Sequence, residues 1–103
     1  MKRRLLIVGI VASLGVVGTA QAGGDAAAGK TKAANCVGCH GANGEGIAPN
    51  PALAGKKEDQ LIQALKDYKS GKRANPVMKT FASQVNDQDT ADLAAYFASL
   101  KKK

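Results

Sequence analysis

The sequence has no tryptophan, one histidine and only two cysteines among its 103 residues. A structural zinc site takes about four Cys or His ligands, so these three side chains cannot supply one. All three lie within one short motif, which leaves no second histidine and no further thiol for a catalytic site. Aromatic residues make up only 4% of the chain and do not alternate with basic ones, so nucleic-acid binding is not expected.

The sequence also lacks an apolar run long enough to span a bilayer, which takes about 20 residues. Its longest run, 5–17, follows the basic Lys2-Arg3-Arg4 and precedes Ala20-Gln21-Ala22, which has the A-x-A form of a cleavage site. We therefore expect a cleaved signal peptide over 1–22 and a mature domain over 23–103. The mature domain would be periplasmic, without stable membrane insertion. An uncleaved membrane anchor is the alternative.

The motif that holds both cysteines and the histidine runs from Cys36 to His40 and has the form C-x-x-C-H, typical of covalent haem attachment. Two thiols at this spacing can each bond one vinyl group on the same edge of a porphyrin. His40 is then carried to the iron, and Gly38 leaves room for the ring. The sequence therefore predicts one covalent haem c, attached through Cys36 and Cys39, with His40 as an iron ligand.

Two other interpretations compete for the cysteine pair. A redox C-x-x-C pair needs a strand before it and a βαβ pattern around it, and the sequence has neither. A plain disulfide between Cys36 and Cys39 remains possible in an oxidising compartment, but it gives His40 no role.

The mature chain is poor in material for a core. After Ala22 it contains only 15 large apolar residues, counting Val, Ile, Leu, Met, Phe and Tyr. So short a chain rarely builds a sufficient core without disulfides, metals or other staples. We therefore expect the haem itself to form the centre of the core. Loss of the three basic residues near the N-terminus leaves a formal charge of +4, too small an excess to indicate nucleic acid as a partner.

The hydrophobic periodicity predicts an all-α domain with three main helices and short helical segments. The first helix begins after Asp25 and continues to about Asn35, the second covers 58–70, and the third follows Asn86. Loops are expected over 41–55 and 71–77, with a short apolar segment around 80–85. The apolar faces of the second and third helices consist of Leu61, Ile62, Leu65 and Tyr68, and of Leu93, Tyr96, Phe97 and Leu100.

Three local signals support these helices. Asn86 can cap the third helix with Asp89 at its third position, and Gly71 is placed to end the second. Gly29 lies inside the first helix, where a glycine costs about 1 kcal/mol relative to alanine. The close approach of another helix would explain it, and a tolerated surface glycine is the alternative.

With these residues in view, the chain resembles the class I c-type cytochromes. It is most similar to the small bacterial monohaem type and to single halves of two-domain dihaem cytochromes c. The resemblance extends over 23–100. It rests on these segments: Gly24-Asp25-Ala26-Ala27-Ala28-Gly29-Lys30, the C-x-x-C-H motif, Pro51-x-Leu53-x-Gly55, Tyr68-x-x-Gly71-x-Arg73, Met78 and Asp92-Leu93-Ala94-Ala95-Tyr96.

The resemblance implies a cytochrome c fold wrapped around a covalently bound haem. It implies that the first and last helices cross at Gly29, against Tyr96 and Phe97. It also implies that the carbonyl of Pro51 accepts a hydrogen bond from the ring of His40, which would orient the ring and raise its basicity. The candidate partners of the haem propionates are Arg73, Asn75 and Tyr68, and Tyr68 also fits a role in the core.

The second axial ligand of the iron is expected to be Met78. His40 is the only histidine, and Met1 would leave with the signal peptide, so Met78 is the one thioether of the mature chain. It lies 38 residues after His40, in an expected loop, as the ligand methionine does in the family. Core filling is the alternative role for such a methionine.

Ligation by a histidine and a methionine fills both axial positions and is typical of electron carriers. The sequence therefore predicts a soluble, periplasmic one-electron carrier of a respiratory chain, not an enzyme. Its expected partners are redox proteins, such as a membrane cytochrome complex or a terminal oxidase or reductase, and it would be a monomer or weak dimer. A haem sensor or peroxidase-like protein, and a subunit of a larger redox complex, are the alternatives.

Overall fold

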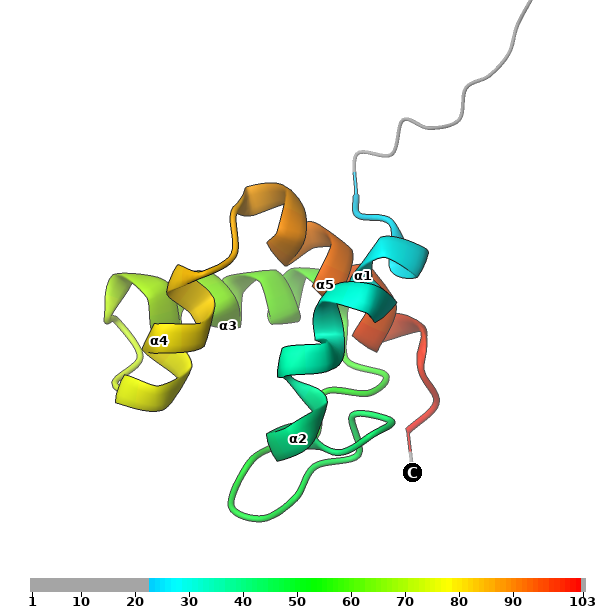
Figure 1. The fold of residues 1–103 in the computed structure, drawn as a ribbon, viewed down its shortest axis with the longest axis horizontal. Coiled ribbons are helices and arrows are strands. Elements are labelled where there is room, and N and C mark those ends of the chain that lie inside the picture. The colour runs from blue at the N-terminus through cyan, green and yellow to red at the C-terminus, as the bar shows by residue number, and fades with distance from the viewer. Residues whose placement is uncertain (1–22, 103) are drawn as a thin grey trace, which may run out of the picture.

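The computed structural model describes residues 23–102, which form a helical domain (Figure 1). No strand occurs among these residues, apart from one isolated bridge between Ile47 and Asn50. The expected all-α fold class is confirmed. The expected signal peptide, 1–22, lies outside the described residues, as does Lys103. The helices are α1 (Ala26–Lys32), the 3-10 helix η1 (Ala33–Asn35), α2 (Val37–His40), α3 (Glu58–Ser70), α4 (Pro76–Ser83) and α5 (Asp87–Ser99).

The first helical segment begins as its sequence predicts. The Asp25 side chain accepts hydrogen bonds from the backbone N–H groups of Ala27 and Ala28, at 2.9 and 3.3 Å. These bonds satisfy two of the donors that a helix start leaves without partners. The segment tightens into η1 after Lys32 and then continues into α2, so one nearly continuous helical stretch leads into the C-x-x-C-H motif.

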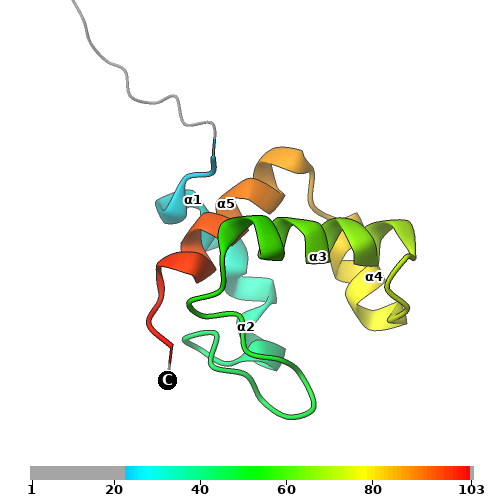
Figure 2. The ribbon, with the colours of Figure 1, turned by 180° about the vertical axis from the view of Figure 1, so that it is seen from behind.

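Helix α1 packs across α5, and Gly29 lies at the crossing (Figures 1 and 2). A Cβ atom placed on Gly29 would overlap the backbone carbonyl of Asp92 and lie 2.8 Å from the Cβ of Tyr96. The glycine is therefore needed for the close approach of two backbones. The contact is with Asp92 and Tyr96. Phe97, the other expected partner, lies in the core with its ring centroid 5.1 Å from that of Tyr96.

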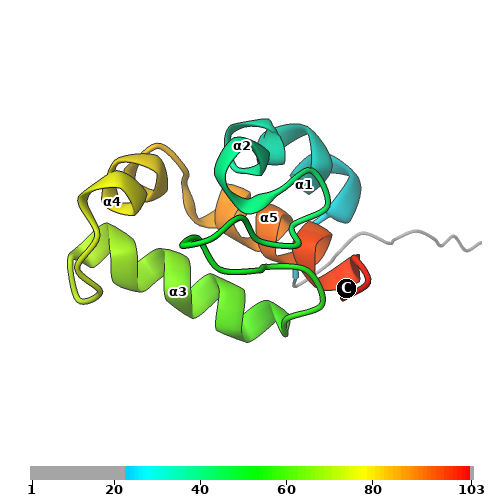
Figure 3. The ribbon, with the colours of Figure 1, turned by 90° about the horizontal axis from the view of Figure 1, so that it is seen from below.

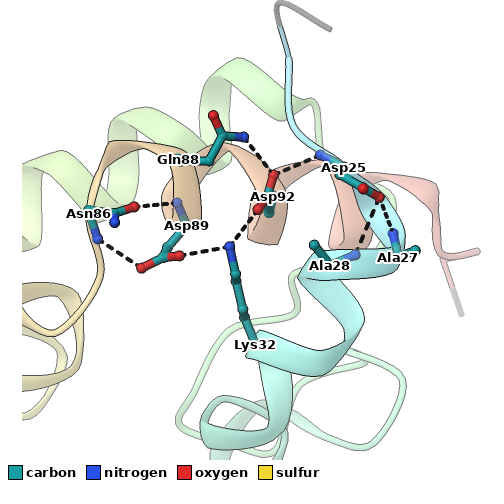
Figure 4. Close-up of polar contacts among 8 residues, drawn as sticks. All are labelled: Asp25, Ala27, Ala28, Lys32, Asn86, Gln88, Asp89 and Asp92. Carbon is teal, nitrogen blue, oxygen red and sulfur yellow. Dashed lines mark hydrogen bonds and ion pairs between the residues drawn. The ribbon is translucent and has the colours of Figure 1, made fainter. Parts of the chain in front are cut away.

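A polar network ties the same two helices together (Figure 4). The buried carboxylate of Asp92 accepts hydrogen bonds from the backbone N–H of Asp25 (2.8 Å), the Nζ of Lys32 (2.6 Å) and the Nε2 of Gln88 (2.8 Å). Lys32 also pairs with Asp89 at 2.7 Å. Because these donors stabilise the charged form, led by the Asp25 N–H, they lower the pKa of Asp92 to about 2.

The main cluster of the apolar core lies between η1, α3 and α5. Its buried residues are Ala33, Leu61, Leu93, Ala94 and Phe97. Two of these five are alanines, so the described core contains few large buried side chains. Helix α3 packs on both α4 and α5 (Figure 2), and α4 thereby lies at the far end of α3 from the α1–α5 crossing.

The structure corrects the expected loop over 71–77. The loop begins at Gly71, whose φ of 87° is the left-handed conformation that commonly ends a helix. It ends earlier than expected, because α4 begins at Pro76 and continues to Ser83. Asn75 is extended, as expected for a residue before proline, but it is also the N-cap of this helix. Proline at the first helical position is itself a start signal, which the sequence analysis did not use.

Candidate haem-binding site

A cavity of about 310 Å³ opens between the C-x-x-C-H motif and helix α4. Figure 3 shows α4 to one side of α2, with α3 running below both. One wall comes from η1, α2 and the loop that follows, and the other comes from the loop before α4 and from α4 itself. The lining residues are Asn35, Cys36, Cys39, His40, Asn50, Asn75, Val77, Met78 and Phe81. The two cysteines, the histidine and the methionine singled out from the sequence therefore line the same cavity.

Helix α2 places three of these groups within a single turn. The backbone N–H groups of Cys39 and His40 both donate to the carbonyl of Cys36, at 3.2 and 3.0 Å. Cys36 is half-buried and Cys39 is exposed, and no disulfide joins them. Burial, and to a lesser degree the charge of Cys39, raises the pKa of the Cys36 thiol. A Cβ atom on Gly38 would meet no protein atom within 4 Å, so space beside the motif is open.

The ring of His40 is buried, with only 6% of the residue exposed, and it is held in one orientation. Its Nδ1 lies 2.7 Å from the carbonyl oxygen of Pro51. A carbonyl can only accept, so Nδ1 carries the proton and donates it. In the neutral ring the other nitrogen, Nε2, then has its lone pair available, which is the form in which histidine binds a metal.

The loop from Gly41 to Gly55 brings Pro51 to His40. Several hydrogen bonds fold this loop back onto the motif and onto itself. The N–H of Gly46 donates to the carbonyl of His40 at 2.6 Å, and the N–H of Leu53 donates to the carbonyl of Gly44 at 2.7 Å. The side-chain amide of Asn50 donates to the carbonyl of Cys39 at 3.0 Å. The sequence analysis predicted a loop here but assigned no role to Asn50.

Met78 lies in the first turn of α4 and not in a loop, which corrects the expectation. Its side chain is partly buried and contributes to the cavity wall. Its backbone N–H donates to the side-chain oxygen of Asn75 at 3.0 Å. The carboxamide of Asn75 is thus used to cap α4.

The three candidate propionate partners occupy different positions in the structure. Tyr68 is 9% exposed and belongs to the core, in agreement with its alternative role. The guanidinium carbon of Arg73 lies 4.8 Å from the centroid of the Tyr68 ring, a cation–π contact. Of the three, only Asn75 lines the 310 Å³ cavity.

The apolar space continues from the cavity toward the core. A second cavity of about 220 Å³ shares Asn35, Cys36 and Phe81 with the first and extends to Leu65, Val85 and Leu93. Phe81, which the sequence analysis placed only in a short apolar segment, therefore borders both spaces. Lys32, Gln84 and Asp89 also line the second cavity, so the space for a flat prosthetic group beside the two thiols has both apolar and charged walls.

The donor set suits a haem. Among residues 23–102, no three His, Cys, Asp or Glu side chains are placed to hold a metal ion between them. What the cavity does offer is a thiol pair for covalent attachment, one imidazole nitrogen and one thioether sulfur. Those are the attachment and ligation chemistries of c-type cytochromes. The helical fold and this cavity together thus indicate a c-type cytochrome.

Comparison with known proteins agrees with that class. The family model for cytochrome c matches residues 26–101. Cytochrome c-554(548) of Halomonas halodenitrificans is 42% identical over 80 residues, which cover 74% of this chain and 96% of that protein. The chain belongs to the cytochrome c family, and it carries covalently bound haem c as members of that family do.

Two further relatives are cytochromes c4. That of Pseudomonas aeruginosa is 50% identical over 97 residues, covering 93% of this chain and 48% of the relative. The crystal structure of reduced recombinant cytochrome c4 from Pseudomonas stutzeri matches with a TM-score of 0.73 and 40% identity, covering 78% of this chain and 47% of the other. The chain therefore spans about half the length of these cytochromes c4.

Proposed function

We propose that this protein is a soluble one-electron carrier of the periplasm, with one haem c ligated by His40 and Met78. The observation that carries the proposal is the single cavity lined by both thiols, the buried His40 and Met78. A haem bound there supplies one-electron chemistry, its iron alternating between the ferric and ferrous states. The remaining roles belong to residues of this chain.

Cys36 and Cys39 attach the group covalently, and the α2 turn fixes their spacing. His40 would hold the iron through Nε2, because Pro51 holds the proton on Nδ1. Met78 would hold it through a soft thioether, which favours the reduced state and raises the potential. With two protein ligands on the iron, substrates would have no open position there, so a carrier is favoured over a catalyst.

The rest of the cavity wall supports the same conclusion. Apart from the thiols and His40, the lining residues are amides and apolar side chains, without an acid or base for proton transfer. A peroxidase or a sensor that activates a ligand needs such groups or an open site. The sensor or peroxidase alternative therefore finds no support among the residues that line this cavity.

Partners are expected where the cavity meets the surface. Val77 lines the cavity and is 61% exposed, and Ile47 on the neighbouring loop is 49% exposed. These are the large exposed apolar residues among 23–102, and basic residues at 72, 73 and 79 lie close by in the sequence. Apolar contact with a basic rim suits transient docking of a redox protein with an acidic rim. We propose a respiratory-chain donor or acceptor, such as a membrane cytochrome complex or a terminal oxidase or reductase.

The predicted signal peptide supports the proposed location. The basic start, the apolar run and the A-x-A site predict cleavage after Ala22. Among residues 23–102, no helix has the length and apolar character needed to cross a membrane. We propose that 23–103 is the mature cytochrome domain, present as a monomer or weak dimer.

A second candidate function comes from two other relatives. One, 35% identical over 69 residues, is the cytochrome subunit of sulfide dehydrogenase from Chlorobaculum tepidum. Another, 39% identical over 77 residues, is a thiosulfate dehydrogenase electron acceptor from Thiomonas intermedia. This chain would then pass electrons as a subunit or dedicated acceptor of a dehydrogenase. Co-purification of a second chain in stoichiometric amount would favour this candidate.

The test of the proposed function uses the full chain expressed in a bacterium that matures c-type cytochromes. Periplasmic extracts should contain a protein that starts at Gly23 and carries one haem on the peptide with Cys36 and Cys39, as mass spectrometry would measure. The oxidised protein should be low-spin, titrate with a one-electron redox curve and leave added CO unbound when reduced. A high-spin protein that binds CO readily would contradict the carrier and favour a sensor or peroxidase.

A further inference from the structure

We infer that Asn75 is a positioning residue for the axial methionine, an inference that rests on the proposed ligation by Met78. Asn75 precedes α4 with φ −161° and ψ 103°, an extended backbone. Its side-chain oxygen accepts the N–H of Met78 at 3.0 Å, and its backbone carbonyl accepts the N–H of Lys79 at 2.8 Å. One residue thus receives the hydrogen bonds of two consecutive residues, the first of which is Met78.

The capping bond has few substitutes at this place. Pro76 has no N–H, so the first turn of α4 is held by the N–H groups of the residues that follow. The N–H of Met78, in the first turn, has no carbonyl partner within its own helix and donates to the side-chain oxygen of Asn75. Loss of the Asn75 carboxamide would leave that N–H to water and release the turn that carries Met78.

Packing does little to hold the same turn. Ala82, near the end of α4, is the buried residue of this helix, and α4 packs mainly on α3. At the start of the helix Asn75, Pro76 and Val77 are exposed, and Met78 is only partly buried. A short helix with so little burial depends on its cap and on whatever its cavity-facing residues bind. The cap and the iron–thioether bond therefore support one another.

This coupling has a measurable consequence. A ligand added from solution binds the iron only when Met78 has left it, so its apparent affinity reports how firmly Met78 is held. A weaker cap lowers the free-energy cost of the open state, because local opening of this turn is easier. Asn75→Ala should therefore tighten the apparent binding of added imidazole to the ferric protein by about fivefold, the size expected for loss of one N-cap.

Two variants separate positioning from general stability. Asn75→Ser keeps a side-chain oxygen that can cap and should return imidazole affinity to near the wild-type value. Asp25→Ala removes the equivalent cap of α1, where the side-chain oxygen accepts the N–H of Ala27 at 2.9 Å, and Asp25 lines neither the 310 Å³ nor the 220 Å³ cavity. It should lower the thermal unfolding midpoint as much as Asn75→Ala does and leave imidazole affinity unchanged.

The experiment is an imidazole titration of the four ferric holoproteins, in which loss of the near-infrared Fe–S charge-transfer band measures imidazole binding. A thermal melt of each protein measures its stability. A shift confined to Asn75→Ala and reversed in Asn75→Ser supports the inference. Equal affinities in wild type and Asn75→Ala, with the band present in both, would overturn the inference and leave the proposed ligation standing. An equal shift in Asp25→Ala would overturn it as well. Absence of the band from the wild type would overturn the ligation itself.

Discussion

The Nδ1 atom of His40 lies 2.7 Å from the carbonyl oxygen of Pro51, eleven residues further along the chain. This bond determines which ring nitrogen faces the cavity, so the loop between the two residues is part of the site. The loop is folded by bonds to the motif itself, including that from Asn50 to the carbonyl of Cys39. Orientation of the histidine therefore depends on how firmly the loop is held.

Asn50→Ala should weaken that loop. The variant loses the 3.0 Å bond to Cys39 and should lower the free energy of unfolding of the holoprotein by about 1 kcal/mol, the usual net worth of one hydrogen bond. Denaturant unfolding followed by circular dichroism measures the change. Asn43→Ala, at an exposed position of the same loop, is the matched control. Equal stabilities of the two variants would refute a role for Asn50.

Acid should weaken the α1–α5 contact through Asp92. Its pKa is lowered from the ordinary value of 3.8 to about 2, so the folded state favours the charged carboxylate. That stabilisation is complete above the ordinary value and is lost as the pH falls through about 2. Unfolding free energy should therefore decline between pH values of about 4 and 2.

Asp92→Asn should be less stable at neutral pH and should flatten the decline, because its side chain does not titrate. Denaturant unfolding at several acidic pH values compares the slopes. Asp59→Asn, which changes an exposed carboxylate on α3, should leave the slope close to that of wild type. If Asp92→Asn retained the full wild-type slope, the network would have no part in the acid response.

Gly29→Ala should push α1 away from α5. The added Cβ would overlap the backbone carbonyl of Asp92, which cannot rotate aside as a flexible side chain would. A gain of about 1 kcal/mol in helix propensity is outweighed by overpacking, so we expect a net loss of about 2 kcal/mol. Thermal and denaturant unfolding measure it. Ala27→Ser adds one atom on the exposed side of the same helix and should change stability by about 0.5 kcal/mol or less.

Haem attachment should be a condition of folding. The described core is small, with two alanines among its five buried members, and the cavities lie beside it. The double variant Cys36→Ala, Cys39→Ala, purified without haem, should show weak helicity by circular dichroism and no cooperative melt. A cooperative, native-like melt of that apoprotein would show that the chain folds without its prosthetic group.

The parts of this structure that the sequence predicted are those set by local signals. Asn86 with Asp89 begins α5, Gly71 ends α3, and Gly29 marks a helix crossing. Each depends on residues close in sequence or on the absence of one side chain. The C-x-x-C-H motif is equally local, and for that reason the prosthetic group could be predicted from five residues.

The parts that the sequence did not predict are contacts between residues far apart in the chain and one helix whose start signal was overlooked. Lys32 and Asp92 are 60 residues apart, and nothing in the periodicity of either helix pairs them. Asn50 reaches Cys39 only because the intervening loop folds back. Helix α4 could have been found, since Asn75 followed by Pro76 has the form of a capped helix start.

The central claim is that Met78 binds the iron opposite His40, and the near-infrared Fe–S charge-transfer band of the oxidised protein tests it most directly. The wild type should be low-spin and show the band. Met78→Ala should lose it, bind added cyanide or CO and have a sharply lower potential, with the haem still attached through Cys36 and Cys39. Val77→Ala, at the neighbouring exposed position, should keep the band. A wild-type protein that is high-spin and binds CO, with neither property changed in Met78→Ala, would contradict the account.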